Sequence, residues 1–173
     1  MLFELIATIT SGLGAAGVVL LLRHLSGGRL PKGLVPTAAG AAMVAFVIWN
    51  DYSWFERTSG GLPDRVEVIA MHSDSAAWRP WTYVFPLTER FTAIDRGSMR
   101  QNDQAPGITM VDVLLFARRA PVTTVPMMID CQGMRRADLV DGVVFDPDGT
   151  VSGVPWYDLP AGDPLLDSVC AAA

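Results

Sequence analysis

The sequence predicts a membrane-anchored protein, with an N-terminal transmembrane hairpin of two helices (residues 1–55) and a mainly antiparallel, β-rich α+β domain outside the cytoplasm (residues 56–173). Three observations predict this fold class. Two long apolar runs lie near the N-terminus, the short stretch between them carries positive charge only, and the remaining chain contains short alternating and β-branched runs. Half of all residues are hydrophobic, which is high for a soluble protein of this length.

The two apolar runs cover about residues 3–22 and 35–55. About 20 apolar residues are enough for a helix to cross the hydrocarbon core of a bilayer. The alternative for the first run is a cleavable signal peptide, but no basic residue precedes the run and Glu4 is acidic. Neither run has an ionisable residue near its middle, which argues against a pump, channel or carrier.

The orientation of the hairpin follows from the loop between the runs, residues 23–33. This loop contains Arg23, Arg29 and Lys32 and no acidic residue. Short loops rich in Lys and Arg stay in the cytoplasm, so the loop is predicted to be cytoplasmic. Both termini and the second domain then lie outside, as in a multi-pass protein of the bacterial inner membrane with a periplasmic domain. Membrane lipids are expected partners of such a hairpin.

Aromatic residues mark the outer end of the second span. Trp49, Tyr52, Trp54 and Phe55 follow closely on one another there. Amphipathic rings prefer the headgroup level of a membrane, so we expect these four residues to form an interfacial belt.

Small residues occur in both spans, among them Gly12, Gly14 and Gly40. Helices in lipid associate where small side chains let their backbones approach. One interpretation is that the two spans simply pack on each other. The other is that one small face is left for a partner membrane protein, a lipid or a pigment, and it places these three glycines at a partner interface.

The second domain contains several strand-like runs bounded by Gly and Pro, which predict an antiparallel sheet. Pro106 and Gly107 are expected in an exposed loop between two strands, and a short helix is expected near the C-terminus. The predicted strands and the helix are Asp64–Met71, Trp81–Leu87, Arg90–Ile94, Ile108–Arg118, Thr123–Cys131, two short strands within Val143–Val154, and the helix Asp163–Cys170.

The two cysteines, Cys131 and Cys170, are the only ones in the chain. A domain outside the cytoplasm meets an oxidising compartment, in which cysteines pair. The predicted disulfide closes a loop of about 40 residues and holds the C-terminus, a place where chains tend to fray. A redox-active pair is the alternative, but it favours Cys-x-x-Cys spacing near a helix start, which is missing here.

The residue types needed for catalysis or metal binding are scarce. The chain has two histidines, and His72, beside Ser73, is the only one outside the membrane. The stretch DPDGTV lacks the spacing of a calcium loop and predicts a hairpin turn. The chain beyond Asp51 contains ten arginines and sixteen acidic residues, so its net charge is −6. This charge disfavours binding to nucleic acid. We therefore predict no enzyme activity, no metal, no cofactor and no nucleic-acid partner.

The densest aromatic stretch outside the membrane runs from Ser75 to Phe91. It contains Trp78, Arg79 and Trp81, and large rings with guanidinium groups are the residue types that dominate protein interfaces. We predict that these three residues contact a partner. The alternative is a β core in which Arg stacks on Trp.

The C-terminal quarter contains an ordered set of acidic, cysteine, arginine, glycine and tryptophan residues: Asp130, Cys131, Arg135 or Arg136, Asp146, Asp148, Gly149, Trp156, Pro160, Val169 and Cys170. This order resembles the closing pattern of the surface-adhesin protein E family and related bacterial envelope proteins. The resemblance implies a small, β-rich extracytoplasmic domain with a disulfide, used for binding and not for catalysis. The chain departs from that family in having two membrane spans in place of a lipoprotein signal, which puts a role on the outer cell surface in doubt.

Two functions from different classes remain. The first is a non-catalytic accessory subunit of a larger inner-membrane complex, with respiratory or photosynthetic electron-transfer complexes as the expected hosts and other integral membrane subunits as partners. This expectation rests on architecture and size. The alternative is a free-standing envelope protein whose periplasmic domain binds a peptide, protein or matrix ligand, as the adhesin resemblance implies. The alternative predicts an exposed groove in the β domain.

Overall fold

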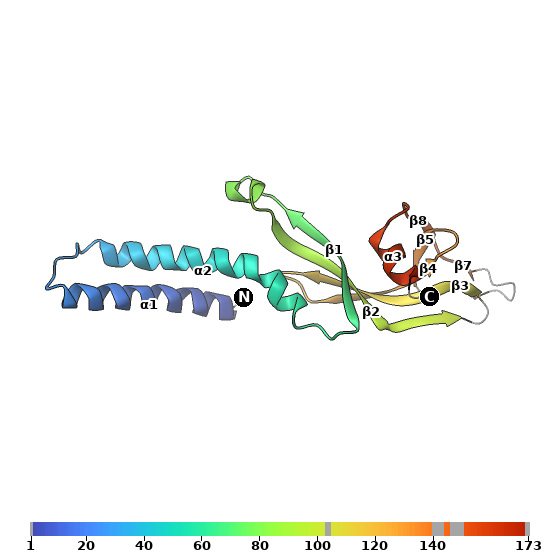
Figure 1. Ribbon diagram of the computed structural model, residues 1–173, viewed down its shortest axis with the longest axis horizontal. Helices are drawn as coiled ribbons and strands as arrows, with labels where there is room; N and C mark the ends of the chain where they lie inside the picture. Colours follow the sequence, from blue (N-terminus) through green and yellow to red (C-terminus); the bar gives the residue numbers. More distant parts are fainter. Residues whose placement is uncertain (1, 103–104, 140–143, 146–150, 172–173) are drawn as a thin grey trace. The chain divides into compact units, whose positions relative to one another are not determined.

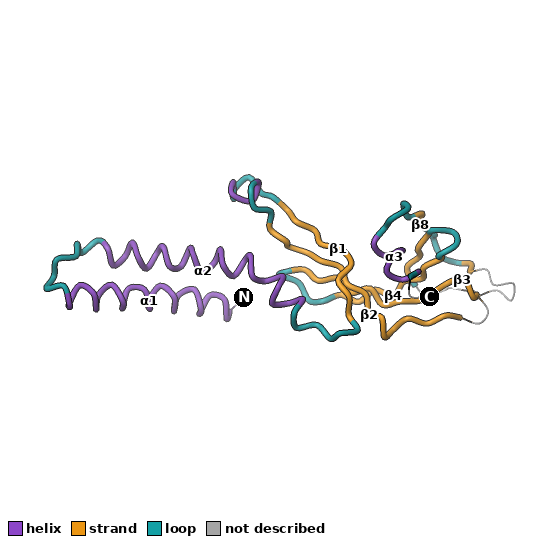
Figure 2. The backbone as a smooth tube through the Cα atoms, viewed as in Figure 1, coloured by secondary structure: helices purple, strands orange, loops and turns teal. Residues whose placement is uncertain are grey.

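The computed structural model describes residues 2–102, 105–139, 144–145 and 151–171. The chain forms two compact units, Met1–Glu56 and Arg57–Ala173. The first unit contains two long apolar helices and the second an antiparallel sheet with a short helix (Figures 1 and 2). The predicted order of two helices followed by a β-rich domain is therefore confirmed.

The first unit is a hairpin of α1 (Leu2–Leu25) and α2 (Leu34–Ser59), and both helices are long and apolar enough to cross a membrane. Both extend a few residues beyond the predicted spans. The chain leaves α1 through Gly27 and Gly28, whose φ angles of 66° and 81° suit glycine and end a helix. Pro36 lies in the first turn of α2, where backbone N–H groups have no partner within the helix, so its missing N–H costs no hydrogen bond.

The second unit is built on a six-stranded antiparallel sheet in the order β1-β2-β3-β4-β5-β8. Strands β1 to β5 follow one another as neighbours, which is the arrangement that short hairpin connections produce. β6 (Val144–Phe145) and β7 (Val151–Ser152) pair separately. The strands of the main sheet are β1 (Val66–Asp74), β2 (Leu87–Asn102), β3 (Ala105–Ala117), β4 (Thr123–Asp130), β5 (Arg135–Asp138) and β8 (Tyr157–Asp158).

Helix α3 (Pro164–Cys170) covers part of one face of this sheet, which we call the α3 face. Its residues Leu165, Leu166 and Val169 are buried against strand residues whose side chains alternate onto that face, such as Ile94 and Ile129. On the opposite face, Met128 and Ala137 pack with the segment that includes Trp156. The core of the domain therefore depends on the last 20 or so residues of the chain folding back onto the sheet.

The prediction of a strand over Trp81–Leu87 is wrong for most of its length. Pro80–Tyr83 forms a 3-10 helix, η1, within the connection between β1 and β2. The Thr82 hydroxyl holds this turn by accepting a hydrogen bond from the Ala76 N–H (2.9 Å) and donating one to the Arg79 carbonyl (2.7 Å). Prolines at positions 80 and 86 lack the N–H that a sheet ladder needs, so residue type alone misled the prediction.

The prediction of a loop at Pro106 and Gly107 is also wrong, because both residues lie in β3. β2 and β3 form a hairpin that is longer than the predicted strands. The pairing shifts between Asp95 and Arg100, and Ser98 bridges the irregularity: its hydroxyl accepts from the Asp112 N–H (2.8 Å) and donates to the Asp95 carbonyl (2.7 Å). A proline is tolerated near the first residue of a strand, as here.

The other secondary-structure predictions for the second unit are confirmed in outline. β1, β3 and β4 occupy the predicted runs, β6 and β7 are the two short strands, and α3 is the predicted C-terminal helix. The predicted turn residues Asp146, Asp148 and Gly149 lie outside the described residues.

Candidate functional site

Several residues of the C-terminal pattern lie around the turn that joins β4 to β5. The Asp130 carboxylate accepts hydrogen bonds from the backbone N–H groups of Gln132 (3.1 Å) and Gly133 (2.9 Å) and from Arg135 Nε (2.8 Å). Arg135 in turn lies over the ring of Trp156, at 4.7 Å from its centroid. Asp130 therefore fixes the β4–β5 turn directly and, by positioning Arg135, also the segment that contains Trp156.

Cys131 and Cys170 form the predicted disulfide, which is confirmed. It joins the turn after β4 to the last residue of α3. At the other end of α3, Asp163 caps the helix by accepting a hydrogen bond from the Leu165 N–H (2.9 Å). A cap at one end and a covalent bond at the other fix a helix of seven residues that is too short to be stable alone.

Asp130 makes the stability of this region depend on pH. Burial raises the pKa of its carboxyl, but hydrogen bonds from Gly133 and Arg135 and the Arg135 charge outweigh burial, so the pKa lies below its ordinary value of 3.8. A carboxyl with a lower pKa in the folded state stabilises the protein above the ordinary pKa and loses this effect as the pH falls below it.

We therefore expect Asp130→Asn to lower the free energy of unfolding by about 2 kcal/mol at pH 7, because charged hydrogen bonds are the stronger ones. The difference from the wild type should shrink as the pH falls from the ordinary value of 3.8 through the lowered pKa of Asp130, where the folded wild-type carboxyl gains its proton. Urea unfolding, monitored by tryptophan fluorescence at pH 7 and at pH 3, measures the loss of unfolding free energy and its dependence on pH. Asp158→Asn, at an exposed aspartate on β8, is the matched control and should cost little. An equal loss for Asp130→Asn at both pH values would contradict this role.

An open groove lies on the α3 face beside the helix, and we call it the sheet groove. It consists of two adjoining hollows of about 400 and 370 Å³ that share His72, Thr92 and Leu115. Thr92 and Leu115 are two residues from the core positions Ile94 and Val113, so they point to the same face. The groove exists because α3 covers only part of the sheet.

The walls of the sheet groove are mainly apolar, with a few polar groups at its rim. Ile69, Leu115 and Leu159 line it, and His72, Arg136 and Asp163 supply the polar groups. A volume of this order and this composition suit a bound apolar side chain or small ligand. Among the described residues, no group of three His, Cys, Asp or Glu side chains could hold a metal ion.

Sequence reasoning missed the sheet groove. His72 is far from Leu115 and from Asp163 along the chain, and only the strand pairing and the position of α3 bring them together. The one signal in the sequence was the shortness of the C-terminal helix compared with the long strands.

The predicted interface residues Trp78, Arg79 and Trp81 lie in the connection between β1 and β2. Trp78 and Trp81 are 78% and 43% exposed, so they are not core residues. Arg79 makes a long ion pair with Glu89 (3.9 Å). The exposure of both rings argues against a β core at this place, and partner contact stays a prediction.

The three glycines predicted at a partner interface are in different environments. A Cβ at Gly12 would collide with the end of the Met43 side chain and lie 2.9 Å from its Cγ, so Gly12 is covered within the hairpin. Gly14 and Gly40 have nothing within 4 Å of an added Cβ. A further contact within the hairpin joins the first turn of α1 to α2, where Glu4 accepts a hydrogen bond from Asn50 (3.3 Å). The four belt residues all lie on α2, and their role at a membrane surface stays a prediction.

No family model matches this chain, and no curated protein or solved structure is significantly similar to it.

Proposed function

We propose that this chain is a non-catalytic accessory subunit of a bacterial inner-membrane complex, anchored by α1 and α2, with its disulfide-bonded β domain in the periplasm. Three features support the anchoring and its orientation. Only 11% and 6% of the two apolar spans are buried, which leaves apolar surface that water would not tolerate. The loop between the helices carries cations only, and the Cys131–Cys170 bond suits an oxidising compartment.

The observation that carries the accessory role is the open small-residue surface of the hairpin. Gly12 lies against Met43 of the other helix, whereas Gly14 and Gly40 are exposed, and a Cβ added at either would meet nothing within 4 Å. Small exposed positions are those at which another transmembrane helix can approach closely. The proposed partners are therefore other integral membrane subunits, and respiratory or photosynthetic electron-transfer complexes are the proposed hosts.

We expect Gly14→Leu and Gly40→Leu to separate the chain from its partners without unfolding the hairpin. The test is purification of the tagged full chain from its native membrane in mild detergent, followed by mass spectrometry. Each substitution should reduce the recovered partner chains by about tenfold, the effect of weakening association by about 1.4 kcal/mol. Val44→Leu enlarges an exposed apolar side chain on α2 without removing a small residue, and it should leave the yield of partner chains unchanged.

A second candidate function is favoured by the sheet groove. An envelope protein that binds a peptide or another apolar ligand through its β domain needs such a groove, with a rim of polar groups like His72 and Arg136. Recovery of the wild-type chain without any other membrane subunit would favour this function over the accessory role.

A further inference from the structure

One end of the sheet has a composition unlike the rest of the domain. The connection between β1 and β2 and the turn between β3 and β4 leave the sheet at this same end, because Asp74 pairs with Leu87, Arg90 with Ala117 and Leu115 with Thr123. We call this end, residues 74–90 and 117–123, the aromatic end. The exposed large apolar side chains on it are Trp78 (78%), Trp81 (43%), Tyr83 (65%), Val84 (72%), Phe85 (65%) and Val122 (52%).

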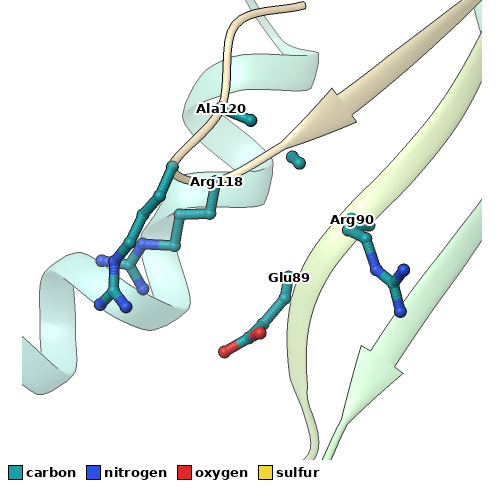
Figure 3. Close-up of a pocket in the computed structure, with 6 residues that line it drawn as sticks. Glu89, Arg90, Arg118 and Ala120 are labelled. Atoms are coloured by element: carbon teal, nitrogen blue, oxygen red, sulfur yellow. The ribbon is translucent and has the colours of Figure 1, made fainter.

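The charge of the domain is divided between this end and the remainder. The aromatic end has four arginines and two acids, a net charge of +2. The rest of the chain after Asp51 has six arginines and fourteen acids, a net charge of −8. Figure 3 shows Arg118 at the β3–β4 turn beside Glu89 and Arg90 of β2. A negatively charged surface would therefore attract this end of the domain and repel the remainder.

Both acidic residues of this end, Asp74 and Glu89, form ion pairs with its arginines and are already included in its net charge of +2. Arg90 pairs with Asp74 (3.3 Å) and Arg79 with Glu89 (3.9 Å). The Arg90–Asp74 pair is open to solvent, whereas the Arg79 side chain is 21% exposed and its contact with Glu89 is long, so both pairs weaken the charge of these arginines only in part. Arg119 is exposed and Arg118 precedes it, and no acidic residue lies within the β3–β4 turn.

The apolar part of the surface has the form that a membrane interface accepts. The rings of Trp and Tyr carry one polar atom on an apolar body and prefer the headgroup level, while Val and Phe favour the acyl boundary. The stretch from Ser75 to Pro86 contains no acid and one cation, Arg79. Its 3-10 turn is held by Thr82, so the rings are presented by a fixed loop.

The length of the link to α2 limits how far this end can lie from the membrane that α2 is proposed to span. Six residues, 60–65, separate the end of α2 from the start of β1. These six residues span about 20 Å when fully extended. The strand β1 is about 30 Å long and leads from this link to the aromatic end. A tether of this length turns lipid contact into an intramolecular event, so even weak affinity for lipid is enough.

We infer that the aromatic end docks on the headgroup region of an anionic lipid bilayer, the same membrane that α1 and α2 are proposed to span. The rings enter the interface, and the arginines lie at the level of the lipid phosphates. This inference rests on the proposed anchoring, and it assigns Trp78, Arg79 and Trp81 to lipid in place of the protein partner predicted from the sequence.

The test places a nitroxide label at Val84→Cys, attached after the native disulfide has formed, in the full chain in nanodiscs of phosphatidylglycerol and phosphatidylcholine in equal amounts. Collision rates with oxygen and with a water-soluble nickel complex report the depth of the label. The oxygen-to-nickel ratio should be several-fold higher at residue 84 than at Gln101→Cys, an exposed control at the other end of β2. The ratio at residue 84 should fall in discs of phosphatidylcholine alone.

Three outcomes would overturn the inference, and they show whether the proposed membrane anchoring fails with it. A chain that does not enter the nanodiscs contradicts the anchoring as well. A chain that enters them with residue 84 in water contradicts the lipid contact only. If that label is in water in nanodiscs but becomes immobilised in native membranes, the aromatic end binds a protein partner.

Discussion

Loss of the disulfide is expected to have the largest effect on stability. Replacing both Cys131 and Cys170 by Ser should lower the free energy of unfolding by about 4 kcal/mol, because the bond closes a loop with a sequence separation of 39. Urea unfolding of the full chain in detergent, with and without reductant, measures the loss.

The single substitutions provide a control for this prediction. Cys131→Ser and Cys170→Ser remove the same bond, so each alone should cost about as much as the pair, and reductant should have no further effect on any of the three variants. Wild-type stability that is unaffected by reductant would contradict the structural role of the bond.

Truncation of Ile129 is expected to have the second largest effect. Ile129 is fully buried in the cluster where β4 meets Leu165 and Val169 of α3. Ile129→Ala should therefore lower the free energy of unfolding by about 3 kcal/mol, through lost burial and the cavity that remains. The same urea titration measures the change.

Thr124→Ala is the matched control, because Thr124 is exposed on the same strand. It should change the stability by no more than about 0.5 kcal/mol. If the two variants lost stability equally, the packing of α3 on this strand could not be the main source of stability in the C-terminal region.

Much of this fold is predictable from local sequence. The two long helices coincide with long apolar runs, and α3 begins with the capping residue Asp163 and with Pro164. β4 coincides with a run that contains β-branched residues and lies between two turns. Such features depend on neighbouring residues only. The disulfide was predictable because the domain has two cysteines and a location outside the cytoplasm suits their pairing.

The features that sequence reasoning missed depend on residues far apart in the chain. β2 continues past its irregularity because Ser98 bonds across to Asp112, and η1 forms because Thr82 bonds back to Ala76. The sheet groove requires strand pairing and the position of α3 together. Residue type and spacing carry little information about such contacts.

The most direct test of the account is the topology of the hairpin. We would fuse alkaline phosphatase, which is active only where its disulfides form, after Gly28 and, in a second protein, after Ala173. The account predicts an inactive fusion in the loop between α1 and α2 and an active fusion at the C-terminus, with Cys131 and Cys170 unreactive to thiol reagents before reduction. An active loop fusion with an inactive C-terminal fusion would place the β domain in the cytoplasm and contradict the account.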